Sequence, residues 1–233
     1  MNAINRSIAI EILAGLYLVL TVVFFWRRPI LATILLSSGI TLWLWYHRNR
    51  ADAAAMLWAA LLGTPSEMVC VYKGVWTYQA PGMVLGIPVW IPLIWASLFC
   101  LFRRIVLTLL ELINHRWPDP KALARKFLFR IIETIIVVYF IWVAFSITRS
   151  IALVYAIIIL IAAFFWRQER DVLIFLVGGF LGTIGEFICM QLGFWQYHYP
   201  YFKTVGLPLS LTMAWGLSAV MIGRLAMRWE TKS

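Results

Sequence analysis

The sequence has little charge and very little cysteine. Only 13% of its 233 residues are charged, whereas an ordinary soluble domain has about 25%, so a soluble globule of this size would lack polar surface. The three cysteines, Cys70, Cys100 and Cys189, include no close pair, which excludes a disulfide framework and a zinc ribbon. The composition also excludes a disordered chain, a coiled coil and a collagen-like rod.

Familiar cofactor and catalytic motifs are missing as well. The sequence contains no Gly-rich phosphate loop, Ser/His/Asp set or c-type haem site, which disfavours redox and nucleotide-driven chemistry. None of its three histidines lies inside a long apolar run, which disfavours a membrane di-iron hydroxylase or desaturase. We therefore expect no cofactor and no metal. Glu67-x-x-Cys70 and Glu186-x-x-Cys189 leave a metal site as an alternative to simple packing of the cysteines.

Long apolar runs are what the sequence has in abundance, since 63% of its residues are hydrophobic. A membrane-spanning helix needs about 20 mostly apolar residues, and barrel strands would alternate polar with apolar residues instead. The first run is too long for a signal peptide and lacks a cleavage site. The sequence predicts an all-α integral membrane protein with eight transmembrane helices, at 8–26, 30–46, 53–72, 87–107, 127–146, 150–166, 172–192 and 207–226.

The basic residues predict how these spans are oriented. With eight spans, most of the 20 Lys and Arg residues lie on the face that holds both termini. The exceptions are Arg27, Arg28, Lys73, Arg149 and Lys203. The positive-inside rule then places both termini in the cytoplasm of a multi-pass protein of the cell (inner) membrane. The net charge of +10 therefore indicates contact with membrane lipid and not a nucleic-acid partner.

An internal repeat is the strongest pattern in the sequence. Residues 62–78, LGTPSEMVCVYKGVWTY, align without a gap to residues 181–197, LGTIGEFICMQLGFWQY. After one inserted residue, Gly86, Pro88 and Trp95 match Gly206, Pro208 and Trp215, and upstream Asp52 matches Asp171.

The repeat predicts how the chain is divided. We expect two parallel four-helix repeats, 1–114 and 127–233, joined by a basic cytoplasmic linker at 115–126. Because each repeat has an even number of spans, both repeats enter the membrane in the same direction. We therefore expect the third and seventh spans to face one another near the axis between the repeats.

Each copy of the repeat carries a carboxyl group inside an apolar span. In the first copy, Gly63, Glu67, Cys70 and Gly74 form one stripe on a helix, and the second copy repeats the stripe around Glu186. The small residues permit close packing between helices. A carboxylate in the hydrocarbon layer must be protonated, paired or exposed to a wet cavity, and such groups are usually functional. Glu67 and Glu186 are therefore the candidate catalytic residues, and the alternative is a purely structural hydrogen bond between the halves.

Several side chains near the two glutamates are candidates for substrate binding. Thr64 and Thr183 lie three residues before the carboxyls, close enough to hydrogen-bond them. The aromatic candidates follow the stripes, and their faces would attract a carbocation formed when an acid protonates a double bond. They are Trp76, Tyr78 and Trp95 in the first copy and Trp195, Tyr197 and Trp215 in the second. An interfacial aromatic belt is the alternative interpretation of the Trp/Tyr pairs.

The order Glu, Gly, aromatic-x-Tyr, Gly-x-Pro and Trp resembles the motif of membrane-bound carotenoid biosynthesis hydratases. The matching residues are Glu67, Gly74, Trp76, Tyr78, Gly86, Pro88 and Trp95, and in the second copy Glu186, Gly193, Trp195, Tyr197, Gly206, Pro208 and Trp215. The resemblance implies an all-helical membrane enzyme that adds water to the ends of long polyenes.

Three functions fit these patterns. The first is an acid-catalysed, hydratase- or cyclase-like enzyme that modifies an isoprenoid or another apolar small molecule. The second is a proton-coupled transporter of small molecules or lipids, and the third is a non-catalytic membrane subunit. A cavity that opens towards lipid favours the enzyme, and an aqueous vestibule favours the transporter.

Overall fold

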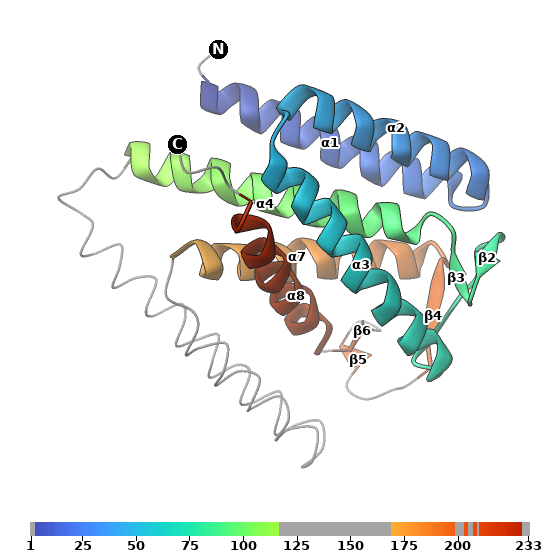
Figure 1. Ribbon diagram of the computed structural model, residues 1–233. Helices are drawn as coiled ribbons and strands as arrows, with labels where there is room; N and C mark the ends of the chain where they lie inside the picture. The colour runs from blue at the N-terminus through green and yellow to red at the C-terminus, as the bar shows by residue number, and fades with distance from the viewer. Residues whose placement is uncertain (1–2, 117–168, 199–202, 205–206, 209, 230–233) are drawn as a thin grey trace.

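The computed structural model is mostly helical and describes residues 3–116, 169–198, 203–204, 207–208 and 210–229. Its helices are α1 (Ala3–Phe25), α2 (Pro29–His47), α3 (Arg50–Tyr72), α4 (Ile91–Arg116), α7 (Glu169–Gln191) and α8 (Ser210–Met227) (Figure 1). The predicted spans at 127–146 and 150–166 lie outside the described residues, as does most of the predicted linker. The division into two repeats of four spans therefore stays a prediction.

Within the described residues, five helices are long and apolar enough to cross a membrane, and they indicate a membrane protein. They contain the segments Ile4–Phe25, Pro29–His47, Arg50–Tyr72, Ile91–Ile113 and Arg170–Gln191. Helix α8 is apolar but shorter, with Leu211–Met227 as its apolar part.

Two predicted span boundaries are wrong for the same reason. The spans predicted at 87–107 and 207–226 would place Pro88 and Pro208 in the first turns of helices, but each lies in a two-residue strand. Strand β3 (Ile87–Pro88) pairs with β2 (Met83–Val84), and β6 (Leu207–Pro208) pairs with β5 (Lys203–Thr204). These small hairpins take up the residues before α4 and α8, so the helices begin at Ile91 and Ser210.

Helices α3 and α7 end in the same kind of turn, which explains a glycine in each sequence copy. Gly74 and Gly193 have φ angles of 66° and 74°, a left-handed conformation that favours glycine. Just after each glycine, the next backbone N–H donates to a carbonyl five residues back: Val75 to Cys70 at 2.9 Å and Phe194 to Cys189 at 2.9 Å.

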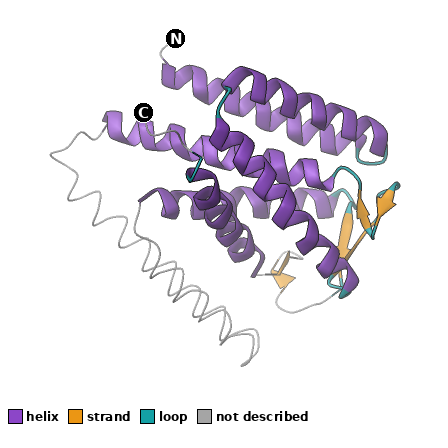
Figure 2. Ribbon diagram, in the orientation of Figure 1, coloured by secondary structure: helices purple, strands orange, loops and turns teal. Residues whose placement is uncertain are grey.

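Two strands that follow these turns join parts of the chain far apart in sequence. Strands β1 (Trp76–Tyr78) and β4 (Trp195–Tyr197) pair antiparallel (Figure 2). In this register Trp76 lies opposite Tyr197 and Tyr78 lies opposite Trp195. In the repeat, Trp76 aligns with Trp195 and Tyr78 with Tyr197, so the Trp of each strand lies opposite the Tyr of the other. The sequence reading, which expected only a short connection here, missed these strands.

The helices pack in pairs, with α3 against α4 and α7 against α8. Helices α1 and α2 lie side by side and pack on α4 (Figure 1). The expectation that the third and seventh spans face one another near the axis between the repeats stays a prediction. The larger contacts between the two helix pairs are those of α3 with α8, of α4 with α7, and of α4 with α8. Their Trp95 and Trp215 rings stack at a centroid distance of 5.1 Å.

A buried ion pair fastens the start of α3 to α4, and a matching pair fastens α7 to α8. Asp52 is 0% exposed and pairs with Arg103 and Arg104, and Arg104 Nε donates to Asp52 Oδ2 at 2.7 Å. Asp171 accepts a hydrogen bond from Arg224 Nη2 at 2.8 Å. The aspartates that align in the sequence repeat therefore make equivalent contacts with the following helix.

The Asp52 pair predicts a difference between two matched variants. Asp52→Asn removes the negative charge that pairs with Arg103, whose side chain is 3% exposed. We expect this substitution to cost about 3 kcal/mol, because removing one partner of a buried ion pair strands the other. Asp171→Asn should cost less, since the Arg224 side chain is 32% exposed and water can solvate it. Thermal unfolding of the two variants in detergent measures the difference, and equal losses would contradict this account.

Candidate functional site

An apolar cavity of about 110 Å³ lies between α1, α4 and α7 and contains both candidate carboxyls. Glu67 from α3 and Glu186 from α7 line it, with only 8% and 9% of each residue exposed. Among the described residues that line the cavity, these two glutamates are the only acidic or basic ones. The two carboxyls from distant parts of the sequence therefore share one otherwise apolar space.

Glu67 is held by an aromatic donor on each oxygen. The Tyr78 hydroxyl donates to Oε2 at 2.6 Å, and the Trp95 indole Nε1 donates to Oε1 at 3.2 Å. Tyr78 reaches the carboxyl from β1 and Trp95 from the first turns of α4. The site of the first sequence copy is thus assembled from three elements, α3, β1 and α4.

Glu186 has the corresponding donors and one more. The Tyr197 hydroxyl donates to Oε2 at 3.0 Å, and the Trp215 indole Nε1 donates to Oε1 at 3.3 Å. In addition, the Trp195 indole Nε1 donates to Oε2 at 3.0 Å. Residues at matching positions of the repeat therefore make matching hydrogen bonds to both carboxyls.

A glycine on each helix makes room for the indole ring that reaches the carboxyl. A Cβ atom added to Gly63 would lie 2.0 Å from the Trp95 ring, and one added to Gly182 would lie 2.4 Å from the Trp215 ring. Glycine at these positions lets each ring lie flat against the helix that carries the glutamate. The sequence suggested that these small residues serve close helix packing, and the structure gives them the more specific role of seating an indole.

The structure places most of the predicted aromatic residues at the cavity. Tyr78, Trp95, Trp195 and Trp215 line it. Trp76 and Tyr197 pack against each other edge to face at 5.4 Å, and Tyr197 reaches the site through its bond to Glu186.

The two threonines are placed differently from our expectation. Thr183 donates to the Gly179 carbonyl at 2.6 Å, and its hydroxyl oxygen lies 2.9 Å from the Thr212 hydroxyl. The Thr64 hydroxyl is buried without a partner among the described residues. The expected hydrogen bonds from Thr64 and Thr183 to the glutamates are not found in the described part of the chain. A helical threonine readily bonds the carbonyl one turn back, which turns its hydroxyl away from a residue further along.

Trp90 is a cavity residue that sequence reasoning missed. It lines the cavity, is 2% exposed, and its indole Nε1 is buried with no hydrogen-bond partner among the described residues. Position 210, its counterpart in the second copy, is serine, so the repeat could not identify it. An unused donor beside an apolar cavity can bind an oxygen atom of a water or a ligand.

The cavity reaches the outside of the helix bundle on its α1 side. Leu18, Val19, Val22 and Val23 of α1 line this side, and Val19 is 46% exposed. Across from them, α7 contributes partly exposed Ile188. The boundary of the cavity between α1 and α7 is therefore made of apolar side chains. Sequence reasoning missed the α1 residues because they belong to an apolar run like any other.

The possible glutamate–cysteine metal site gains no support from the cavity. Cys189 lines it and Cys70 does not. In the described ranges, no group of three or more His, Cys, Asp or Glu residues is placed to hold a metal ion.

The glycine seats predict a contrast between neighbouring substitutions. Gly63→Ala and Gly182→Ala should displace Trp95 and Trp215, each costing about 1–3 kcal/mol as overpacking does. Gly185→Ala on the same face of α7 is the control, because a Cβ there meets nothing within 4 Å. Alanine favours a helix over glycine, so the control should be neutral or slightly stabilising. Thermal unfolding of the three variants tests this, and a loss in Gly185→Ala equal to the others would contradict it.

The two tyrosines predict a dependence of stability on alkaline pH. Burial, and then the charge of Glu67, raises the pKa of Tyr78 well above its usual value of 10. Burial and Glu186 likewise raise the pKa of Tyr197. Because the unfolded chain releases these protons at about pH 10, stability is fully present below pH 10 and falls as the pH rises above it. Above pH 10, each tyrosine that stays protonated in the folded protein lowers the free energy of unfolding by about 1.4 kcal/mol per pH unit.

The measurement compares unfolding temperatures between pH 9 and pH 11. The double variant Tyr78→Phe/Tyr197→Phe should lose stability less steeply with pH than the unaltered protein, whatever its starting stability. The same slope in both proteins would show that these hydroxyls ionise normally.

Relatives give no guide to the chemistry of this site. Comparison with protein-family models, with curated proteins and with solved structures gave no match to this chain. The resemblance to carotenoid biosynthesis hydratases rests on the sequence motif and stays a prediction. The function is therefore argued from the side chains around the two glutamates.

Proposed function

We propose that the protein is a multi-pass inner-membrane enzyme that modifies a lipid or isoprenoid by acid catalysis with Glu67 and Glu186. One observation carries the proposal: both carboxyls line a single apolar cavity, each hydrogen-bonded by Trp and Tyr side chains. A cavity with so little polarity suits a hydrocarbon substrate better than a polar one. The carboxyls are the groups in it that could transfer a proton.

The size of the cavity indicates which part of a substrate reacts. A volume of about 110 Å³ equals the share of roughly three or four water molecules in the liquid. It could hold the end of a long apolar molecule but not the whole. The remainder would extend past the exposed Val19 on the α1 side, towards the lipid around the helices. We therefore propose a reaction at the terminus of a chain that enters from the side.

The proposed reaction is proton addition to a terminal carbon–carbon double bond. One carboxyl donates its proton to one carbon and becomes a carboxylate, and the other carbon becomes a carbocation. The aromatic faces of Tyr78, Trp95, Trp195 and Trp215 stabilise this cation. Water then adds to the cation and releases a proton to the carboxylate, which gives an alcohol and restores the acid. Trp90, with its unused N–H, can bind the oxygen of that water.

A cyclase-like outcome needs the same groups. An internal double bond would attack the cation in place of water, and the new cation would lose a proton to the carboxylate. The acid is again restored, and the product is an isomer of the substrate.

We also propose that the chain consists of eight spans in two parallel four-helix repeats, with both termini cytoplasmic. Equivalent contacts of aligned residues support the repeats: Glu67 with Tyr78 and Trp95 corresponds to Glu186 with Tyr197 and Trp215. The excess of basic residues on the face with the termini supports the orientation.

A proton-coupled transporter is the second candidate, favoured by the two buried carboxyls at matching positions of the two sequence copies. A transporter would carry a substrate across the membrane unchanged, whereas the proposed enzyme makes a new product. A non-catalytic subunit would need neither carboxyl for anything beyond assembly.

The experiment replaces each carboxyl by its amide. Glu67→Gln and Glu186→Gln should each lower product formation at least about 100-fold, as loss of a general acid or base does. Extracts of cells that make the protein are analysed for lipids and pigments by mass spectrometry. Membranes isolated from these cells and then incubated in D₂O should add one deuterium to a product carbon, and incubation in H₂¹⁸O should label the hydroxyl of a hydrated product.

A matched control is Glu11→Gln. Glu11 is a buried glutamate on α1 that accepts a hydrogen bond from Thr108 and does not line the cavity. This variant should keep the product. Lipid and pigment profiles unchanged by Glu67→Gln and Glu186→Gln would refute the enzyme. Substrate flux into vesicles with no new product would favour the transporter.

A further inference from the structure

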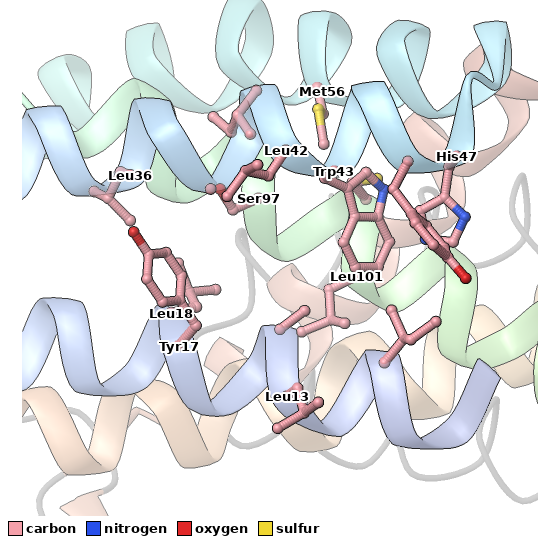
Figure 3. Close-up of a pocket in the computed structure, with 16 residues that line it drawn as sticks. Leu13, Tyr17, Leu18, Leu36, Leu42, Trp43, His47, Met56, Ser97 and Leu101 are labelled. Carbon is pink, nitrogen blue, oxygen red and sulfur yellow. The ribbon is translucent and has the colours of Figure 1, made fainter. Parts of the chain in front are cut away.

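A second and larger cavity, of about 400 Å³, lies between α1, α2 and α4 (Figure 3). Its lining is almost wholly apolar and includes Leu13, Tyr17, Leu36, Leu42 and Leu101. Leu13 and Leu42 are 65% and 63% exposed, so the cavity is a groove open to the outside of α1 and α2. Leu18 lines this groove and the glutamate cavity alike, but neither glutamate belongs to the groove. We call this surface the α1–α2 groove.

One end of the α1–α2 groove is polar. His47 lies there, at the end of α2, with its ring 4.4 Å from the Trp43 ring and 4.8 Å from the Tyr46 ring (Figure 3). The His47 Nε2 atom is buried and has no hydrogen-bond partner among the described residues. The Arg6 guanidinium lies over the Tyr46 ring, 5.7 Å from its centroid.

The neighbouring acid does not neutralise this end. Asp52 accepts a hydrogen bond from Trp43, which lines the groove, but it is already paired with Arg103 and Arg104. The charges around this end therefore sum to a positive value. An anion is the complementary ligand.

The length of the groove matches one leaflet of a bilayer. From Leu36, which lines its apolar part, to His47 is roughly 16 Å along α2, at about 1.5 Å per residue. Half of the hydrocarbon core of a bilayer is about 15 Å. The polar end coincides with the end of an apolar helix, where a lipid headgroup would lie.

We propose that the α1–α2 groove binds an anionic phospholipid. One acyl chain lies along the groove, and the phosphate accepts a hydrogen bond from His47 Nε2 and pairs with Arg6. A second copy of the protein would cover the apolar walls but would leave the basic end and the buried nitrogen without a partner. The site is independent of the proposed chemistry at Glu67 and Glu186.

Native mass spectrometry of the purified protein tests the proposal. Phosphatidylglycerol and phosphatidylcholine with identical acyl chains are titrated separately, and bound lipids are counted after detergent is removed. We expect one phosphatidylglycerol to be retained about fivefold more tightly than phosphatidylcholine, since one basic residue near a membrane surface contributes about that factor.

Variants separate the headgroup from the chain. His47→Phe should weaken both lipids several-fold, because both carry the phosphate that His47 contacts. Arg6→Gln should weaken phosphatidylglycerol more than phosphatidylcholine, whose choline already balances the charge of its phosphate. The control is Arg27→Gln, because Arg27 packs on Trp26 beyond the other end of α1. Ala14→Phe, inside the groove, should weaken both lipids. Ile12→Phe is its control, because Ile12 is 56% exposed and outside the groove.

Several results would overturn the proposal. Equal retention of the two lipids would remove the role of the basic end. Equal lipid binding by Ala14→Phe and Ile12→Phe would remove the role of the groove. A dimer mass that carries no lipid would identify the groove as a contact between copies. Displacement of phosphatidylglycerol by an equimolar isoprenyl diphosphate would identify it as a site for that molecule instead.

Discussion

A carboxyl group in an apolar helix has no water to solvate it, and the described structure around the two glutamates follows from this constraint. The donors that solvate Glu67 and Glu186 come from outside their own helices, from β1, β4, α4 and α8. Each donor must be aimed by its own element. The glycine seats, the left-handed turns after α3 and α7 and the short strand pair all serve to bring these side chains to the carboxyls.

The same arrangement of hydrogen-bond donors surrounds both glutamates, with two differences. Glu186 accepts a third hydrogen bond, from Trp195, and Trp90, which also lines the cavity, has an indole N–H with no partner among the described residues. Two carboxyls with unequal surroundings can take unequal roles, one as a proton donor and the other as a carboxylate that stabilises a cation. The repeated arrangement of helix, strand and indole thus provides two carboxyls, and the surroundings of each carboxyl can still differ.

Sequence patterns predicted the helical membrane class, the aligned glutamates and most of their aromatic neighbours. Hydrophobic runs report length and polarity, so they located α1 to α4, α7 and α8, although the predicted starts of α4 and α8 are wrong and α4 continues to Arg116, past the predicted end at 107. They do not report side-chain direction, and so Thr64 and Thr183 were assigned to the carboxyls although Thr183 bonds elsewhere. Strands of two or three residues carry no periodicity, which is why β1 and β4 were missed. Trp90 was missed because its counterpart is a serine.

The register of β1 and β4 has a mechanical consequence. Tyr78 lies opposite Trp195, and Trp76 lies opposite Tyr197, so the donors of one carboxyl are set by the strand that serves the other. Side chains alternate between the faces of a strand, and a slip of one residue would turn the side chains of the slipped strand, its tyrosine included, to the opposite face. The position of each tyrosine therefore depends on the pairing of its strand with the strand that serves the other glutamate, so the two acid sites are coupled through one strand pair.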